Sequence, residues 1–201
     1  GKSTLTYSLS WVLSELGMRV LVVDADMRRP TIHKLAKLPN AVGLSTAIAT
    51  DRHWSKLVRT GDTPNLEILT AGPAPPNPVA LLDSKLMQNL LEEWRETYDY
   101  VLIDTPPIAT LADAQCLSNH VDSAILVVGM ERATRDALHR AIESLRGCDV
   151  AGFVANLTNK SHGSYGYTAR SYYGKLTSEN SSTNKQTEEK IWKLLNRFRR
   201  S

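Results

Sequence analysis

The 201-residue sequence predicts an α/β fold in which a mostly parallel sheet has helices on both faces. Three observations predict it. Short apolar runs such as Val20–Val23 alternate with segments of helical periodicity. Two of these runs end in a carboxylate, at Asp24 and at Asp104. The chain begins with GKST at 1–4, which matches the end of the phosphate-binding loop G-x-x-x-x-G-K-[ST].

The first predicted element is the helix that follows this loop. Gly17 is suited to end this helix. The apolar face of the helix is made of leucines at helical spacing: Leu5, Leu9, Leu13 and Leu16. Loop, helix and the strand at Val20 form a βαβ unit that lacks its first strand. Because the sequence starts inside the motif without a Met, we expect a fragment whose first strand lies upstream. The alternative is that GKST is an incidental polar start to a helix.

The second element is the strand in VLVVDADMRRP, from Val20 to Pro30. A continuous apolar run is typical of a strand buried on both faces. Asp24 and Asp26 then lie at its carboxyl end, the edge at which open α/β sheets bind ligands. Two carboxylates beside a buried run are costly unless a cation pairs with them. The sequence therefore predicts a cationic ligand or partner here.

The remaining elements follow in chain order. A short helix is expected at 31–38, small surface helices at 43–49 and 54–58, and a strand at 66–70. Asn77 as N-cap and Pro78 predict one long helix with an apolar face of Val79, Leu82, Leu86, Leu90 and Trp94. The strand 100–103 precedes Asp104, and a helix at 112–117, a strand at 124–128, a helix at 134–146 and a strand at 151–155 follow.

Composition separates a domain from a tail. Residues 1–157 have a net charge of −3, whereas residues 158–201 have a net charge of +6. The domain therefore has no basic surface of the kind that nucleic-acid binding requires, and we expect no nucleic-acid partner. Cys116 and Cys148 lack any metal-binding spacing and are expected to be reduced thiols in a cytoplasmic protein.

The tail itself divides in two. Residues 158–187 are rich in Ser, Gly, Asn, Thr and Tyr and predict a flexible segment. Residues 188–201 predict a basic amphipathic helix, with Ile191, Leu194, Leu195 and Phe198 on one face. Three roles stay open for this helix: lying on an anionic membrane, docking on a partner, or capping the domain.

The loop and the strand-end carboxylates are expected to meet at one sheet edge. Lys2 and a helix N-terminus bind phosphate, Ser3 binds a metal ion, and an aspartate holds that ion directly or through water. With Asp24 and Asp26 on one strand and Asp104 on another, the sequence predicts a site for ATP and Mg²⁺.

These motifs together resemble the bacterial tyrosine kinases, the cytoplasmic autokinases of capsule and exopolysaccharide export. The phosphate loop, VLVVDADMR, GPAPPNPVALLDS, YDYVLIDTPPIATLADA and the tail tyrosines all fit, over about residues 1–173. The fold implied is that of a P-loop nucleotide hydrolase. The doubled aspartate distinguishes this group from the related ParA/MinD partition ATPases, which usually keep one.

The resemblance implies a role for each site residue. Gly1 would belong to the nucleotide-binding loop, Lys2 would contact the β- and γ-phosphates, Ser3 the Mg²⁺ ion, and Thr4 the region of the α-phosphate. Asn156, just past the last strand, resembles the position that reads adenine in related ATPases.

The aspartates would divide the chemistry. Asp24 would be the catalytic base that orients the incoming tyrosine hydroxyl and accepts its proton late, because a carboxylate is too weak a base for early abstraction. Asp26 and Asp104 would hold Mg²⁺ through its water shell. For Arg28, a structural or solvated position and a phosphate-facing one stay equally open.

The resemblance also implies phosphoacceptors and partners. The acceptors would be the tail tyrosines, phosphorylated in trans within a ring of identical subunits: Tyr165, Tyr167, Tyr172 and Tyr173. The ring would lie at the inner face of the plasma membrane, with a transmembrane activator, fused upstream or separate, and a cognate tyrosine phosphatase. Two other functions stay open, a partition-type ATPase without kinase activity and a nucleotide-binding regulatory domain without turnover.

Overall fold

The computed structural model describes residues 1–50, 53–108, 112–130 and 133–157. The chain divides into one unit at Gly1–Thr158 and a second at Asn159–Ser201, and all described residues lie in the first. The predicted tail, with its tyrosine cluster and its basic helix, lies outside the described residues. No described helix combines the length and the apolar character that crossing a bilayer requires.

The strands form two groups, and nearly all of their pairing is parallel. The strands are β1 (Val20–Asp24), β2 (Arg59–Thr60), β3 (Leu66–Leu69), β4 (Tyr100–Asp104), β5 (Ala124–Gly129) and β6 (Val150–Asn156). The first group has the order β2-β3-β1-β4, in which β2 is antiparallel to β3, and the second is a parallel β5–β6 pair. The predicted α/β class with a mostly parallel sheet is therefore confirmed.

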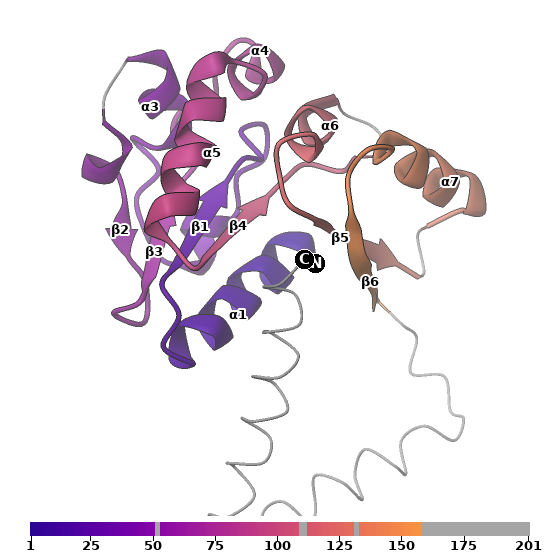
Figure 1. Ribbon diagram of the computed structural model, residues 1–201, viewed down its shortest axis with the longest axis horizontal. Helices are drawn as coiled ribbons and strands as arrows, with labels where there is room; N and C mark the ends of the chain where they lie inside the picture. Colours follow the sequence, from indigo (N-terminus) through magenta and orange to yellow (C-terminus); the bar gives the residue numbers. More distant parts are fainter. Residues whose placement is uncertain (51–52, 109–111, 131–132, 158–201) are drawn as a thin grey trace, which may run out of the picture. The chain divides into compact units, whose positions relative to one another are not determined.

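Helices cover both faces of the larger sheet (Figure 1). They are α1 (Lys2–Glu15), α2 (Ile32–Leu35), α3 (Leu44–Ala49), a 3₁₀ turn η1 (Trp54–Lys56), α4 (Pro78–Leu82), α5 (Lys85–Thr97), α6 (Ala112–Ser118) and α7 (Arg135–Ser144). Successive residues of β1 point to opposite faces. Leu21 and Val23 pack into the core shared with α3, α4 and α5, while Val20 and Val22 are buried on the face toward α1.

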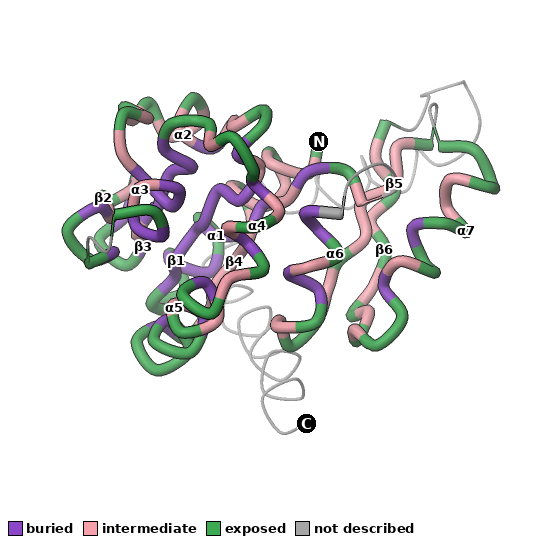
Figure 2. Tube along the Cα trace, turned by 90° about the horizontal axis from the view of Figure 1, so that it is seen from above, coloured by how far each residue is buried: buried purple, intermediate pink, exposed green. Residues whose placement is uncertain are grey.

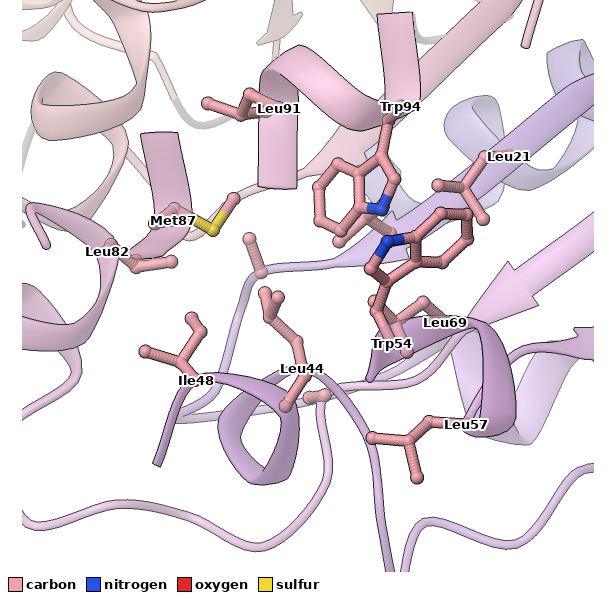
Figure 3. Close-up of a cluster of buried hydrophobic side chains, with 14 of the residues drawn as sticks. Leu21, Leu44, Ile48, Trp54, Leu57, Leu69, Leu82, Met87, Leu91 and Trp94 are labelled. Atoms are coloured by element: carbon pink, nitrogen blue, oxygen red, sulfur yellow. The ribbon is translucent and has the colours of Figure 1, made fainter. Parts of the chain in front are cut away.

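An aromatic pair fills the core beneath α5. The rings of Trp54 and Trp94 meet nearly edge to face, with centroids 6.1 Å apart (Figure 3). The Trp54 indole N–H donates to Glu93 at 2.6 Å, so its polar atom is satisfied at the rim of the core. This packing fixes η1 against α5 and explains why Trp54 is only 6% exposed.

Two expectations about helices were wrong here. The predicted small surface helices bury Leu44, Ile48 and Trp54, because α3 and η1 form part of the core instead of lying on top of it. The predicted long helix is two helices, α4 and α5, and Ser84 caps the second by accepting from the Met87 N–H.

The break between α4 and α5 shifts the buried face. Met87 and Leu91 are buried on α5, while Leu86, assigned to the apolar face, is 46% exposed. The predicted leucine face of α1 is also only partly buried, because Leu16 is 38% exposed. The buried residues of α1 include Ser14, whose hydroxyl accepts a hydrogen bond from the Thr63 hydroxyl at 2.6 Å.

The β5–β6 half of the unit is more open than the β1–β3 half. Figure 2 shows buried residues gathered around β1 and β3, and mainly intermediate or exposed ones along β5, β6 and α7. Phe153 on β6 is 59% exposed and Ile125 on β5 is 47% exposed. Among the described strands, none pairs with both β4 and β5.

Candidate active site

Two predicted carboxylates lie side by side at the carboxyl end of the larger sheet. Asp24 and Asp104 are the last register partners of the parallel β1–β4 ladder. The Ala25 N–H donates to the Asp104 carbonyl at 2.8 Å and closes the ladder just beyond them. The sequence placed both at strand ends, and the sheet order makes those strands neighbours.

Asp24 is completely buried and organises the loop that follows β1. Its Oδ2 accepts from the backbone N–H groups of Thr31 at 2.9 Å and Ile32 at 3.0 Å, and its Oδ1 accepts from that of Asp26 at 3.2 Å. Burial raises the pKa of the Asp24 carboxyl to about 7, and the three N–H donors limit the rise while Asp104 adds to it. The carboxylate therefore holds the loop closed and titrates near neutral pH.

Asp26 lies further along the same loop and is partly exposed. Its Oδ1 accepts from the Arg29 N–H at 3.0 Å, which fixes a tight turn over residues 26–29. Asp26 also raises the pKa of Asp104, so the two carboxylates act on each other electrostatically. This places Asp26 at the same end of the sheet as the other two aspartates.

Asp104 is buried, and neither of its carboxylate oxygens accepts a hydrogen bond of normal geometry from the described residues. Burial raises its pKa, and the neighbouring Ser3 hydroxyl and Lys2 ammonium offset part of the rise. A buried carboxylate with both oxygens unsatisfied is costly in the ligand-free protein. Such a group is suited to receive a cation or its water shell.

The chain start completes the site. Lys2 and Ser3 are the first residues of α1, so the helix N-terminus and its positive dipole end lie beside Asp104. A Cβ atom at position 1 would lie 1.7 Å from Asn156 Nδ2, so Gly1 is in direct contact with the end of β6. The Asn156 Oδ1 accepts from the Leu157 N–H at 2.8 Å.

Most of the predicted site residues therefore converge on one edge of the unit. Lys2, Ser3 and Asp26 each act on the Asp104 carboxyl, Asp24 is the register partner of Asp104 in the β1–β4 ladder, and Asn156 touches Gly1. Thr4 is exposed on the first turn of α1. The four predicted acceptor tyrosines lie outside the described part of the chain.

One site residue was missed by the sequence analysis. Arg28 donates through Nε to Asp113 Oδ2 at 2.8 Å and through Nη2 to Asp113 Oδ1 at 3.2 Å. Of the two positions left open for Arg28, the described structure shows the structural one. The signal for Asp113 was its place in the first turn of the helix after the DTPP loop.

The residues at this edge offer oxygen ligands suited to a magnesium ion, but the described ones do not form a complete set of protein ligands. The orphaned oxygens of Asp104 beside the Ser3 hydroxyl are hard oxygen ligands of the kind Mg²⁺ takes. Within the described ranges, no group of three or more His, Cys, Asp or Glu side chains is placed to hold a metal ion. A Mg²⁺ ion here would therefore depend on water and on the phosphate oxygens of a nucleotide.

Comparisons with known proteins agree with this arrangement. A family model described as an AAA domain matches residues 1–148. The tyrosine-protein kinase YwqD of Bacillus subtilis is 39% identical over 170 residues, covering 83% of this chain and 72% of YwqD. The putative tyrosine-protein kinase CapB of Staphylococcus aureus is 36% identical over 177 residues, covering 87% of this chain and 76% of CapB.

Solved structures give the same result for the fold. The crystal structure of the chimerical protein CapA2B2 superposes with a TM-score of 0.76 at 34% identity, over 80% of this chain and 72% of that one. The septum site-determining protein MinD of Pyrococcus horikoshii, complexed with Mg-ADP, superposes with a TM-score of 0.64 at 22% identity, over 85% and 71%. At 22% identity, the likeness to MinD shows a similar fold and nothing further.

Proposed function

The chain belongs to the bacterial tyrosine kinases, and we propose that it transfers the γ-phosphoryl group of ATP to the tyrosines of its own tail in a neighbouring copy. The observation that carries the proposal is the buried Asp104 carboxylate. It lies next to Lys2 and Ser3, and its oxygens accept no hydrogen bond of normal geometry from the described residues. Phosphoryl transfer depends mainly on positioning and on neutralising charge, and this edge of the sheet offers both.

Lys2 and the first turn of α1 would bind the phosphates. The helix N-terminus presents backbone N–H groups and the positive end of the helix dipole, and the Lys2 ammonium adds a full positive charge. Bound Mg²⁺ would neutralise negative charge on the phosphate oxygens. Ser3, Asp26 and Asp104 would hold that ion, the two carboxylates through its water shell, and Asn156 would lie near the base.

Asp24 would orient the acceptor hydroxyl. A tyrosine has a pKa near 10, whereas burial raises the pKa of Asp24 to about 7, so the gap is smaller than for an exposed aspartate. Three backbone N–H bonds hold the Asp24 carboxylate in place, with two on Oδ2 and one on Oδ1. Its fixed position favours late acceptance of the proton, after the bond to phosphorus has begun to form.

The acceptors proposed are Tyr165, Tyr167, Tyr172 and Tyr173. Each phosphorylation adds about −2 to a tail region whose net charge is +6, so full modification would reverse the sign of that region. A change of that size would loosen the contacts within the proposed ring of subunits.

The biological setting is proposed from the relatives. A putative tyrosine-protein kinase in the cps region of Klebsiella pneumoniae is 33% identical over 167 residues, but this chain covers only 23% of it. We propose a role in capsule or exopolysaccharide export at the inner face of the plasma membrane. A transmembrane activator, fused or separate, and a tyrosine phosphatase would be its partners.

The test is tyrosine phosphorylation by the intact protein. We expect labelling with γ-³²P-ATP that an anti-phosphotyrosine blot detects, that Lys2→Met abolishes, and that peptide mapping places on residues 165–173. Asp24→Asn should abolish phosphotyrosine while ATP binding is largely kept. Loss of ATP binding instead would assign Asp24 to the metal site, and phosphate found only elsewhere would exclude the tail tyrosines.

A second candidate is favoured by the likeness to MinD, whose fold superposes over 85% of this chain. Such a protein would hydrolyse ATP and bind a partner without phosphorylating protein. ADP release without any phosphotyrosine in the intact protein would support it. Absence of both products would support a regulatory nucleotide-binding domain.

A further inference from the structure

The ion pair between Arg28 and Asp113 joins an exposed guanidinium to a buried carboxylate, and the proposed mechanism does not use it. Two N–H groups of one planar guanidinium reach the two oxygens of one carboxylate, at 2.8 and 3.2 Å. The Asp113 side chain is 1% exposed, while that of Arg28 is 41% exposed. A carboxylate this deeply buried needs a charged partner, so the pair is tightly coupled.

This pair joins the loop that carries Asp26 to the helix α6, which follows the strand that ends at Asp104. Arg28 follows Asp26 by two residues on the loop after β1, and Asp113 lies in the first turn of α6, after the loop that follows β4. The β1–β4 ladder ends at Asp24 and Asp104. Beyond the end of the ladder, the ion pair connects the loop after β1 to the first turn of α6.

Asp26 lies within electrostatic reach of the same guanidinium. The hydrogen bond to Asp113 is the main cause of the raised pKa of Arg28, and Asp26 contributes to it. The turn between Asp26 and Arg29, closed by a 3.0 Å hydrogen bond, connects Asp26 rigidly to Arg28. Movement of Arg28 would therefore move Asp26 relative to Asp104.

We infer that Arg28 and Asp113 form a positioning pair that sets the place of Asp26 relative to Asp104, so that both carboxylates serve one Mg²⁺–nucleotide complex. The inference rests on the proposed nucleotide site. Arg28 acts through Asp26 and binds no phosphate itself. Lysine cannot replace it, because an ammonium group lacks the planar pair of donors that spans both oxygens of Asp113.

The chain contains a matched control at the other end of the same two strands. Arg19, just before β1, also reaches one carboxylate with two guanidinium nitrogens, bonding Asp99 at 3.1 Å through Nη2 and 3.4 Å through Nε. Asp99 directly precedes β4. This pair shares the chemistry and the strands of the first but lies away from the predicted site.

The main measurement is the Mg²⁺ concentration that gives half-maximal binding of a fluorescent, non-hydrolysable ATP analogue to the intact protein. Arg28→Lys and Asp113→Asn should each raise this midpoint about tenfold, the range found for residues that orient metal ligands. Arg19→Lys and Asp99→Asn should leave it within twofold of the wild type. Binding of the analogue in EDTA should be the same in all variants.

A measurement on the nucleotide-free protein gives a second readout. The N–H groups of Thr31 and Ile32 are bonded to Asp24 inside the loop that Arg28 restrains. Their hydrogen exchange should be about tenfold faster in Arg28→Lys and unchanged in Arg19→Lys. If single variants unfold, the double variant Arg28→Met/Asp113→Leu leaves no buried unpaired charge and should fold with the same raised midpoint.

The inference is overturned if Arg28→Lys leaves the Mg²⁺ midpoint within twofold, or if Arg19→Lys raises it equally. Failure of the proposed function has a different signature. A wild-type protein that binds the Mg²⁺–nucleotide but never forms phosphotyrosine refutes the kinase proposal and leaves the midpoint comparison intact. An active kinase with unchanged midpoints refutes the positioning pair alone.

Discussion

The two ends of the β1–β4 strand pair carry the same kind of ion pair in opposite surroundings. At the amino end, Arg19 bonds Asp99 in partly exposed surroundings, with side chains 58% and 32% exposed. At the carboxyl end, Arg28 bonds Asp113, whose side chain is 1% exposed. One end therefore resembles an ordinary solvated surface, where such a pair contributes little to stability.

The carboxyl end also holds more negative charge than its neighbours neutralise. Asp24 and Asp104 are buried there with raised pKa values, and no group in the described part of the chain donates a hydrogen bond of normal geometry to the Asp104 carboxylate. The difference shows that the same two strands are stabilised at one end and kept electrostatically incomplete at the other. The Mg²⁺ ion of the proposed nucleotide complex would supply positive charge at the second end, and changes at the two ends should have different effects.

The largest effect is expected for Asp104→Asn. Replacing a buried, unsatisfied carboxylate by a neutral amide should lower Mg²⁺–nucleotide binding and kinase activity about 100-fold. The same change should raise the free energy of unfolding of the nucleotide-free protein by about 1–2 kcal/mol. Urea unfolding and phosphotyrosine formation measure the two effects. Asp99→Asn at the other end is the control, and a loss of activity there would remove the contrast.

The next largest effect is expected on the pH dependence of the free energy of unfolding, through Asp24. Because the pKa of Asp24 is raised to about 7 in the folded protein, its contribution to stability is fully present below the unfolded value near 4 and is lost as the pH rises through 7. Between pH 5 and pH 8 the wild type should lose on the order of 2 kcal/mol relative to Asp24→Asn.

Urea midpoints of the two proteins, nucleotide-free and at matched ionic strength, measure this difference. The amino end provides the contrast, because a wild type compared with Asp99→Asn should show no such loss over the same range. Parallel pH profiles for wild type and Asp24→Asn would show that Asp24 stays ionised throughout, and the raised pKa would then be wrong.

A smaller effect is expected for Gly1→Ala. A Cβ atom at this position would lie 1.7 Å from Asn156 Nδ2, so the Asn156 side chain must move away from the head of α1. We expect nucleotide affinity to fall about tenfold, corresponding to about 1.4 kcal/mol. Titration with a fluorescent ATP analogue measures it.

Gly17→Ala is the matched glycine variant. Gly17 has φ +84°, and a Cβ atom at this position would have no other atom within 4 Å. The change therefore introduces backbone strain without a steric contact. It should lower the free energy of unfolding by about 1 kcal/mol and leave nucleotide affinity unchanged. Equal losses of affinity in both variants would mean that Gly1 acts through helix stability and not through Asn156.

The smallest effect is expected for Arg19→Met. An exposed ion pair contributes little to stability, and this one lies away from the site. The melting temperature should fall by a few degrees at most, with unchanged phosphotyrosine formation. A fall in activity would show that the amino end of the strand pair communicates with the site.

The strand-end carboxylates could be predicted because each follows a continuous apolar run. Such runs place Asp24 and Asp104 at the ligand-binding edge of a parallel sheet whichever strands are neighbours. Asp113 could not be predicted as the partner of Arg28, because the two lie 85 residues apart and only tertiary packing brings them together.

The boundary between α4 and α5 could not be predicted, for a local reason. The sequence from Pro78 to Thr97 keeps helical periodicity across Asp83, but Ser84 restarts the backbone as an N-cap, and the buried face shifts with it. The short segments around Leu44 and Trp54 have too few residues to show a period. Their burial follows from the space between α5 and the sheet, which no local pattern records.

If Asp104 serves the proposed Mg²⁺–nucleotide site, the lifetime of the protein would depend on the supply of nucleotide. A ligand present at 1,000 times its Kd stabilises the folded form by about 4 kcal/mol, which lowers the unfolded population about a thousandfold. When ATP runs low, that protection fades and proteases meet the unfolded chain more often. Under the proposed function, the same unsatisfied carboxylate would therefore make the nucleotide-free protein the form that is degraded faster.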